Sequence, residues 1–454
     1  MALMAKARAM SSLASLASRL SLPTTATAPF CPSEVRGTVA VAPQGPWWRV
    51  LWQAAGPGLL VAVGYMDPGN WATDIAAGSQ FGHGLLFVVL ACGLAAIVLQ
   101  SLAMRVGLAS GQDLAQLARR HYSPAACRAL WLLAELAIIA TDIAEVLGAA
   151  LALHLLFRVP LWVGVLLTGL DTLIVLGLKG HGFRQLEAIV LGLIATITLC
   201  FGVQLAIVGV DGAALAAGAV PDLARLAQPG ALVLAIGILG ATVMPHNLYL
   251  HSSVVQTRLG DRSEQGTRRA LRLAGADTVV SLLLATLVNV AILVLAAEAF
   301  HGHGHRDVGS IEDAWRLLAP ITGAGLAPLL FGVALLAAGQ SATFTGTVAG
   351  QVVLEGFLDL KIPCWQRRIL TRALAIVPAL AGVLWLGQGA VGKLLVATQV
   401  VLSLQLPFAI WPLLRFAGNR QVMGRFAASR LMLAIGWLLF VLILLANLAL
   451  VAGL

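Results

Sequence analysis

The chain has 454 residues, of which 59% are hydrophobic and only 11% are charged. Soluble domains average about 25% charged residues, so this composition excludes an ordinary soluble protein and indicates a polytopic membrane protein. The net charge of +9 could indicate a nucleic-acid partner, but the basic residues line one predicted membrane face, which favours a cytoplasmic surface instead.

The first 46 residues differ from the rest of the chain. They are rich in Ser, Ala and Thr, and Glu34 is their only acidic residue. The composition resembles an organellar transit peptide, but it fits a disordered cytoplasmic tail or an upstream start codon better, because composition alone is a weak signal. We expect a disordered tail over residues 1–46 and a transmembrane domain over residues 47–454.

Eleven apolar runs of membrane-spanning length follow the tail. A helix needs about 20 apolar residues to cross the bilayer, and the runs lie near residues 50–80, 85–108, 128–157, 160–178, 187–209, 231–256, 271–299, 325–357, 369–387, 390–416 and 430–452. With the N-terminus inside, the only basic residues left for the outer side are Arg158, Arg225, Arg306, Arg316 and Lys393. Cytoplasmic connections carry the excess of Lys and Arg, so the C-terminus is predicted outside.

The first run contains a carboxylate, Asp67, followed at once by Pro68 and Gly69. An acidic residue inside a membrane is costly and usually marks a functional site. Proline removes a backbone donor and glycine tolerates unusual dihedral angles, so the two residues together predict a broken helix. The unwound segment would present Asp67, Asn70 and free carbonyl groups to a small cation.

The third run carries three acidic residues, Glu135, Asp142 and Glu145. At 100° per residue, Asp142 and Glu145 lie about 20° and 80° from Glu135 around the helix, so all three form one stripe. Three acids on one face of a membrane helix cost too much for a packing role alone. The stripe therefore indicates a functional role for these acids.

The sixth run contains a second break, from Gly240 to Asn247, in which Met244 precedes Pro245 and His246 follows it. A methionine in an apolar helix usually packs, but beside a helix-breaking proline Met244 is better interpreted as lining a site. Its thioether suits transition metals and not calcium or magnesium. His246 is either a hydrogen-bonded core residue or a proton carrier, and its position near an acid favours the second.

The two breaks lie five runs apart. An odd number of helices per unit gives two units of opposite orientation, which is the inverted-repeat architecture of many transporters. The repeats are expected over about 47–209 and 231–416, with the helix at 430–452 peripheral. Two interrupted apolar segments at matching places are the best pointer in a sequence to a transporter's binding site.

Three motifs together resemble the NRAMP family of proton-coupled divalent-metal transporters, in particular its bacterial manganese transporters. The resemblance covers essentially all of residues 47–454 and leaves out the tail. It rests on Asp67-Pro68-Gly69-Asn70, on Met244-Pro245-His246-Asn247, and on Gly339 to Thr347 continuing through Ala349-Gly350-Gln351.

The resemblance implies roles for individual residues. It implies that Asp67, Asn70, Met244 and the carbonyl of Ala241 hold the metal ion, that Gly64 stands at the corresponding place in the first break, and that Gln399 reaches the ion in some states. It also implies that Asp142 and Glu145 belong to the proton route. The proton-path candidates from both arguments are His246, Asp142, Glu145, Glu135 and Arg372, the last as a partner at the inner end of the ninth run.

The sequence thus predicts an all-α membrane protein with a LeuT-like inverted repeat, importing Mn²⁺ or Fe²⁺ with protons across the inner membrane. A magnesium symporter or an organic-solute symporter of the same architecture remains the alternative. No enzyme is expected, because the zinc-protease and serine-hydrolase motifs are absent. Beyond metal ions, protons and the bilayer, we expect no cofactor, nucleic acid or obligatory protein partner. The five cysteines lack the spacing of a zinc site or a disulfide framework.

Overall fold

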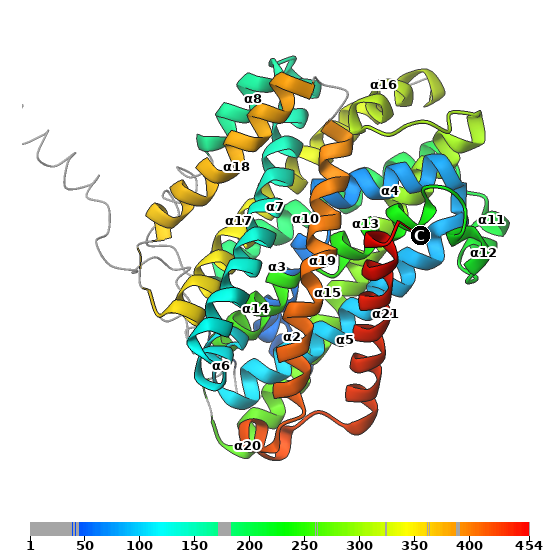
Figure 1. Ribbon diagram of the computed structural model, residues 1–454. Coiled ribbons are helices and arrows are strands. Elements are labelled where there is room, and N and C mark those ends of the chain that lie inside the picture. The colour runs from blue at the N-terminus through cyan, green and yellow to red at the C-terminus, as the bar shows by residue number, and fades with distance from the viewer. Residues whose placement is uncertain are drawn as a thin grey trace, which may run out of the picture.

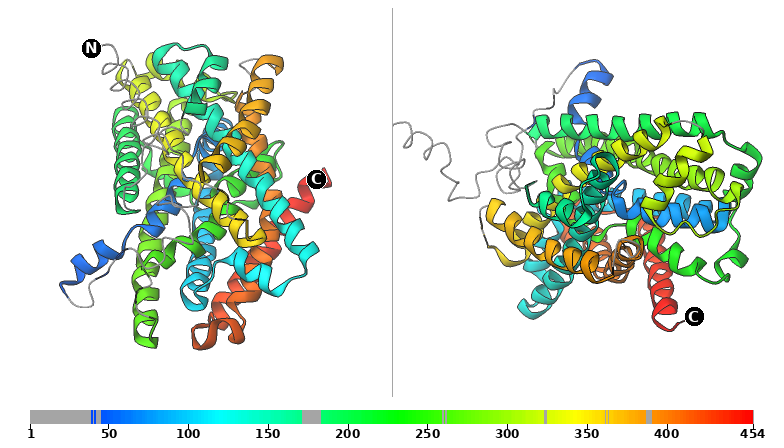
Figure 2. Two further views of the ribbon diagram at one scale, coloured as in Figure 1. Left: turned by 90° about the vertical axis from the view of Figure 1, so that its left-hand side faces the viewer. Right: turned by 90° about the horizontal axis from the view of Figure 1, so that it is seen from above.

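The computed structural model describes residues 45–453 apart from 171–182, 259, 261, 323–324, 361, 363 and 387–390, together with residues 39 and 41. In this part of the chain all regular structure is helical, and the long helices form one bundle (Figures 1 and 2). The predicted tail, residues 1–46, lies almost entirely outside the described residues.

Each of the eleven predicted runs coincides with helix, which confirms the all-α membrane architecture. Uninterrupted helices cover most of them: α5 (Leu86–Ser110), α7 (Pro124–Phe157), α10 (Phe183–Val208), α15 (Glu264–Ala299), α17 (Leu326–Leu358), α18 (Cys364–Leu386), α19 (Val391–Ala417) and α21 (Arg430–Val451). The fourth run is described as α8 (Leu161–Leu167) and η2 (Thr168–Leu170), and its remainder lies outside the described residues. Eight helical runs of the described chain are long and apolar enough to cross a membrane.

The first and sixth runs are both interrupted, as predicted. The first consists of α3 (Pro57–Gly64) and α4 (Pro68–Phe81). The sixth consists of α13 (Ala231–Thr242) and α14 (Pro245–Val254), continued by η3 (Val255–Arg258). Both second halves begin with proline, which fits the first helical position because the backbone N–H it lacks would have no partner there.

The beginning of the first run differs from the prediction. Residues 47–54 form a separate helix, α2 (Trp47–Ala54), and the chain turns at Gly56 before α3 begins. The turn has φ 143° at Gly56, a conformation that only glycine adopts without strain. Helix α2 projects from the bundle, and its Trp47, Trp48 and Trp52 are exposed (Figure 2, left).

The helix pairing follows the two-fold pattern of an inverted repeat. Helix α5 packs on α15 and α7 on α17, which pairs the second and third helices of each unit with their counterparts. Likewise α3 contacts α10, as α13 contacts α19. Helix α21 lies at the edge of the bundle against α19 and α5 (Figure 1), and nearly all of its apolar side chains are exposed or only partly buried.

Short helices cover both ends of the bundle. The end predicted to be cytoplasmic, at the bottom of Figure 1, carries α6 (Leu114–His121), α20 (Arg420–Met423) and η6 (Gly424–Phe426). The short helices in the connections predicted outside are η1 (Gly82–Leu85), α11 (Gly212–Gly218), α12 (Leu223–Leu226), η4 (His301–His303) and α16 (Ile311–Thr322).

Candidate metal centre at the two helix breaks

The first break holds a buried carboxylate, and only one of its two oxygens accepts a hydrogen bond from the described residues. Asp67 is the N-cap of α4, and its Oδ1 accepts a hydrogen bond from the Asn70 backbone N–H at 2.8 Å. Asp67 is 0% exposed and its Oδ2 has no hydrogen-bond partner in the described structure. The side-chain oxygen of Asn70 is also buried, and no described residue hydrogen-bonds to it. Buried polar atoms of this kind are rare, because each costs free energy unless something binds it.

The second break places a thioether and a hydroxyl in a similar position. Met244 precedes α14 and is 0% exposed, and its Sδ lies 3.6 Å from Nδ2 of Asn247. The Thr242 hydroxyl and the Asn247 side-chain oxygen are buried without hydrogen-bond partners in the described structure. This break therefore offers neutral oxygen atoms and one sulfur, with no charge.

Each break also frees one carbonyl group for a predictable reason. In an α-helix the carbonyl of residue i accepts from the N–H of residue i+4. Four residues after Gly64 stands Pro68, and four residues after Ala241 stands Pro245. Proline has no N–H, so neither carbonyl can receive the usual helical bond. Gly64 and Ala241 are therefore suited to present oxygen to a cation, as the resemblance implied.

Two side chains bridge the breaks. A side chain at Gly64 would collide with Nδ2 of Asn247, so the second break packs directly on the end of α3. A side chain at Gly69 would collide with the Gln399 amide, and one at Gly240 with the Gln399 backbone carbonyl. Gln399 of α19 thus touches both breaks, and its Oε1 is buried without a hydrogen-bond partner in the described structure.

The predicted ligands are thus gathered around two touching helix breaks. One carboxylate, amide oxygens, backbone carbonyls and one thioether form the set. The described residues hold no group of three or more His, Cys, Asp and Glu side chains that could bind a metal. A mixed set with one charge can strip water from a divalent ion without holding it as tightly as a permanent metal site would.

The acidic stripe of α7 is divided between two ion pairs. Asp142 and Glu145 both face Gly346 of α17. Arg372 of α18 lies 3.6 Å from Oε2 of Glu145 and donates a hydrogen bond to Thr343 at 3.1 Å.

Glu135 is bound elsewhere. Both of its carboxylate oxygens accept from Arg367, at 2.8 and 2.9 Å. Sequence reasoning gave no role to Arg367, since nothing in the local pattern of α18 distinguishes it from Arg372.

The stripe approaches the first break through Gly148. A side chain at Gly148 would collide with the ring of Pro68, so α7 packs closely against the beginning of α4. Glu145 lies one helical turn before Gly148. Asp142 interacts electrostatically with His246, whose Nδ1 is buried without a hydrogen-bond partner in the described structure. His246, Asp142 and Glu145 are thus brought close to Asp67 and its break.

A buried hydrogen-bond network, which sequence reasoning missed, adjoins the first break. Gln100 of α5 donates to the Tyr65 hydroxyl at 2.8 Å, and its Oε1 lies 2.9 Å from Nδ1 of His251. His251 also lies 3.5 Å from the Thr278 hydroxyl. The sequence signal for this network was Gln100 itself, a polar residue among the apolar residues of α5.

The beginning of α3 is held by a buried ion cluster. The Asp277 carboxylate of α15 accepts from the backbone N–H of Gly56 at 3.2 Å and of Gly58 at 2.7 Å. Beside it, Arg258 pairs with Glu187 of α10 at 2.6 Å. Residues of α10 and α15, one helix from each repeat, thus hold the N-terminal end of α3 in place.

Comparison with known proteins agrees with this geometry. The family model described as natural resistance-associated macrophage protein-like (Nramp) matches residues 58–453. A divalent metal cation transporter MntH of Ralstonia nicotianae is 62% identical over 430 residues, which is 95% of this chain and 97% of the relative. MntH 1 of Pseudomonas aeruginosa is 62% identical over 432 residues, covering 95% and 98% of the two chains.

Solved structures show the same likeness. The manganese transporter of Eremococcus coleocola superposes with a TM-score of 0.85 at 38% identity, covering 92% of this chain and 89% of that one. A closed form of Mhp1, a nucleobase-cation symporter, matches at a TM-score of 0.56 with 18% identity over 92% and 93% of the chains. The second match shows a shared fold alone, which extends the architecture beyond metal transporters.

Proposed function

The chain belongs to the Nramp family of multi-pass membrane transporters, and we propose that it imports divalent transition-metal ions, Mn²⁺ first and Fe²⁺ second, together with protons. The membrane is the inner membrane, with the N-terminus in the cytoplasm and the C-terminus outside, because the basic residues concentrate on the corresponding side. The ions are cargo, and the protein acts as a carrier and not as an enzyme.

One observation carries the proposal. Asp67 Oδ2 is a buried carboxylate oxygen without a hydrogen-bond partner in the described structure, and it stands beside an orphaned amide oxygen and a carbonyl that proline has released. A negatively charged pocket of this kind is stabilised when a cation enters it. An organic substrate with a carboxylate would instead need a helix N-terminus without a facing acid.

Met244 supports a transition metal over magnesium. Mg²⁺ is bound by oxygen in octahedral geometry and gives up water reluctantly. A thioether competes poorly for that ion, but Mn²⁺, Fe²⁺ and Co²⁺ accept it at little cost relative to water. Met244 is fully buried between Ala241 and Asn247 in the same break, where an alkaline-earth site would benefit from another oxygen.

The coupled proton is proposed to leave through α7. His246, Asp142 and Glu145 form a continuous set of titratable groups that starts beside the metal ligands, and Arg372 adds a positive charge at Glu145. A metal ion entering at Asp67 would favour release of a proton from this set, because both carry positive charge. Glu135 lies farther along α7, where it pairs with Arg367 of α18, and would complete the route.

Transport by reconstituted protein tests the proposal. Proteoliposomes that contain the full chain and an internal pH dye should take up Mn²⁺ and acidify in the same minutes, whereas Mg²⁺ and Ca²⁺ at equal concentration should do neither. Empty liposomes are the control for leak. Equal uptake of Mg²⁺ would favour the magnesium symporter, and Mn²⁺ uptake without acidification would remove the coupling.

A further inference from the structure

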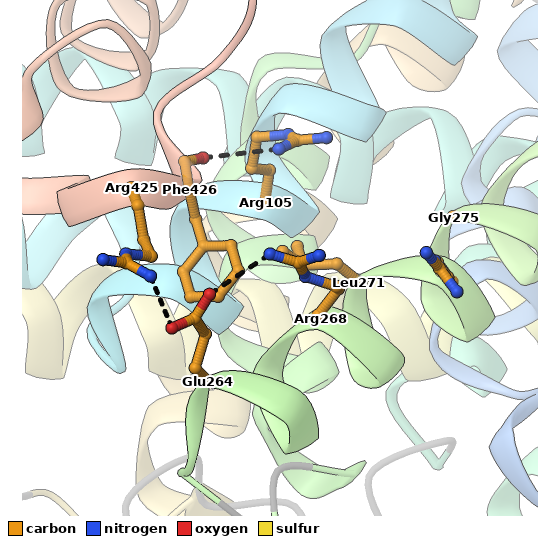
Figure 3. Close-up of a pocket in the computed structure, with 8 residues that line it drawn as sticks. Arg105, Glu264, Arg268, Leu271, Gly275, Arg425 and Phe426 are labelled. Carbon is orange, nitrogen blue, oxygen red and sulfur yellow. Dashed lines mark hydrogen bonds and ion pairs between the residues drawn. The ribbon is translucent and has the colours of Figure 1, made fainter.

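A basic cavity of about 670 Å³ lies at the predicted cytoplasmic end of the bundle, away from both helix breaks. It opens between the inner ends of α5 and α15 and the turn η6 that leads into α21 (Figure 3). Its lining combines four arginines and one glutamate with apolar groups: Arg105, Arg268, Arg272, Arg425, Glu264, Leu271, Gly275 and Phe426.

Among the described residues, the positive charge of this cavity exceeds the negative charge. Glu264 is shared between two of the arginines, Arg425 at 2.6 Å and Arg268 at 3.1 Å. Among the described residues, Arg105 and Arg272 have no carboxylate within ion-pair distance. Arg105 donates to the Phe426 backbone carbonyl at 3.3 Å, and its Nε is buried without a hydrogen-bond partner in this part of the chain. A partly buried guanidinium with an unused donor is suited to an anion.

The two unbalanced arginines stand where lipid-facing helix surfaces end. Leu94 lies eleven residues before Arg105, about 20° around α5, and is 62% exposed. Leu283 lies eleven residues after Arg272, about 20° around α15, and is 45% exposed. Each helix therefore presents an apolar stripe to the membrane and an arginine at its inner end. Phe426 adds an apolar wall at the same level.

We propose that this cavity binds the phosphate of an anionic phospholipid headgroup from the inner leaflet, with the acyl chains lying along α5 and α15. Guanidinium groups bind phosphate oxygens in pairs, and basic pockets between helices on the cytoplasmic side bind such headgroups. The apolar stripes favour a lipid over a soluble phosphate, which would gain nothing from them. The bound lipid would tie η6 and the peripheral α21 to the helices α5 and α15.

The test compares lipid affinities of the purified full chain in detergent. Phosphatidylglycerol and phosphatidylcholine with the same acyl chains are titrated, and binding is read from native mass spectra and from the shift in melting temperature. The wild type should bind phosphatidylglycerol at least about tenfold more tightly. Arg272→Gln should weaken that binding about fivefold, and Arg105→Gln in addition about fivefold more, since each basic residue near an anionic surface contributes about 1 kcal/mol.

Arg420→Gln is the matched control, because Arg420 is exposed on α20 at the same end and does not line the cavity. It should leave the affinity unchanged. Arg272 is also exposed, so its single variant remains informative if the Arg105 variant folds poorly. Equal lipid preference in the wild type and Arg272→Gln would overturn the proposal. Inorganic phosphate that displaces phosphatidylglycerol at millimolar concentration would identify a soluble anion as the ligand and overturn the lipid.

Discussion

Asp67 and Glu145 are both 0% exposed acids in membrane helices, yet their surroundings are opposite. Glu145 has Arg372 at 3.6 Å and the Thr343 hydroxyl at 3.4 Å. Asp67 has one backbone N–H on one oxygen and nothing from the described residues on the other. Among the described residues, the carboxylate at the break has no counter-charge, whereas the carboxylate in the continuous helix has one.

The difference indicates how the two acids are used. A site whose cation must arrive and leave cannot also hold a permanent arginine, because the fixed charge would compete with the cargo. A residue that stays buried through the cycle needs its partner, since an uncompensated buried charge costs several kcal/mol.

The largest effect is expected for Asp67→Asn. The variant keeps a good helix N-cap but removes the only carboxylate among the proposed ligands, so Mn²⁺ uptake should fall at least about 1,000-fold, corresponding to about 4 kcal/mol. Uptake into proteoliposomes at matched protein content measures it.

Asp113→Asn is the matched control for this change. Asp113 caps α6 with the same geometry, accepting from the Gln116 N–H at 2.8 Å, but it lies far along the chain from both breaks. Its variant should transport nearly as well as the wild type. Near-normal uptake by the Asp67 variant would remove the proposed site.

The second largest effect is expected on stability, when Glu145 loses its counter-charge Arg372. Arg372→Met leaves Glu145 buried without its arginine and should destabilise the fold by about 3 kcal/mol. The double variant with Glu145→Gln should recover most of that loss, because neither charge remains. Thermal unfolding of both purified variants decides the matter, and a double variant no more stable than the single one would show that the pair is not the cause.

A smaller effect is expected on coupling. Asp142→Asn combined with Glu145→Gln should leave Mn²⁺ binding within about threefold of the wild type, because neither side chain is a proposed ligand. Acidification driven by Mn²⁺ should fall about tenfold, since general proton carriers at such sites contribute at least that much. Internal pH and metal uptake recorded in the same vesicles separate the two quantities. Full acidification in the double variant would place the route elsewhere.

The smallest effect concerns selectivity. Met244→Ala should keep part of the Mn²⁺ uptake, since the oxygen ligands remain, but Ca²⁺ should compete about fivefold better. The buried Met104 of α5 lies away from both breaks and provides a control for truncating a methionine. Met104→Ala should alter stability without altering the Mn²⁺ to Ca²⁺ ratio. An unchanged ratio in both variants would reduce Met244 to a packing residue.

Local chemistry explains why so much of this molecule was predictable. Apolar length defines the helices, and Pro68 and Pro245 define the breaks whatever surrounds them. The ion pairs could not be predicted from the sequence, because Arg367 and Arg372 differ only in which turn of α7 they face after packing. The turn at Gly56 has a local signal in Gly56-Pro57-Gly58, but the apolar run continues on both sides of it, and its length alone predicts one span. The ligand and proton roles remain predictions.

The arginines near the start of α3 bind the main chain. Arg258 donates to the backbone carbonyls of Ala54 and Ala55, at 3.2 and 2.8 Å, and Arg184 donates to that of Ala55 at 2.6 Å. Every residue type carries these carbonyls. Over evolutionary time the side chains of this segment can therefore change without loss of these hydrogen bonds, whereas the two arginines must be kept.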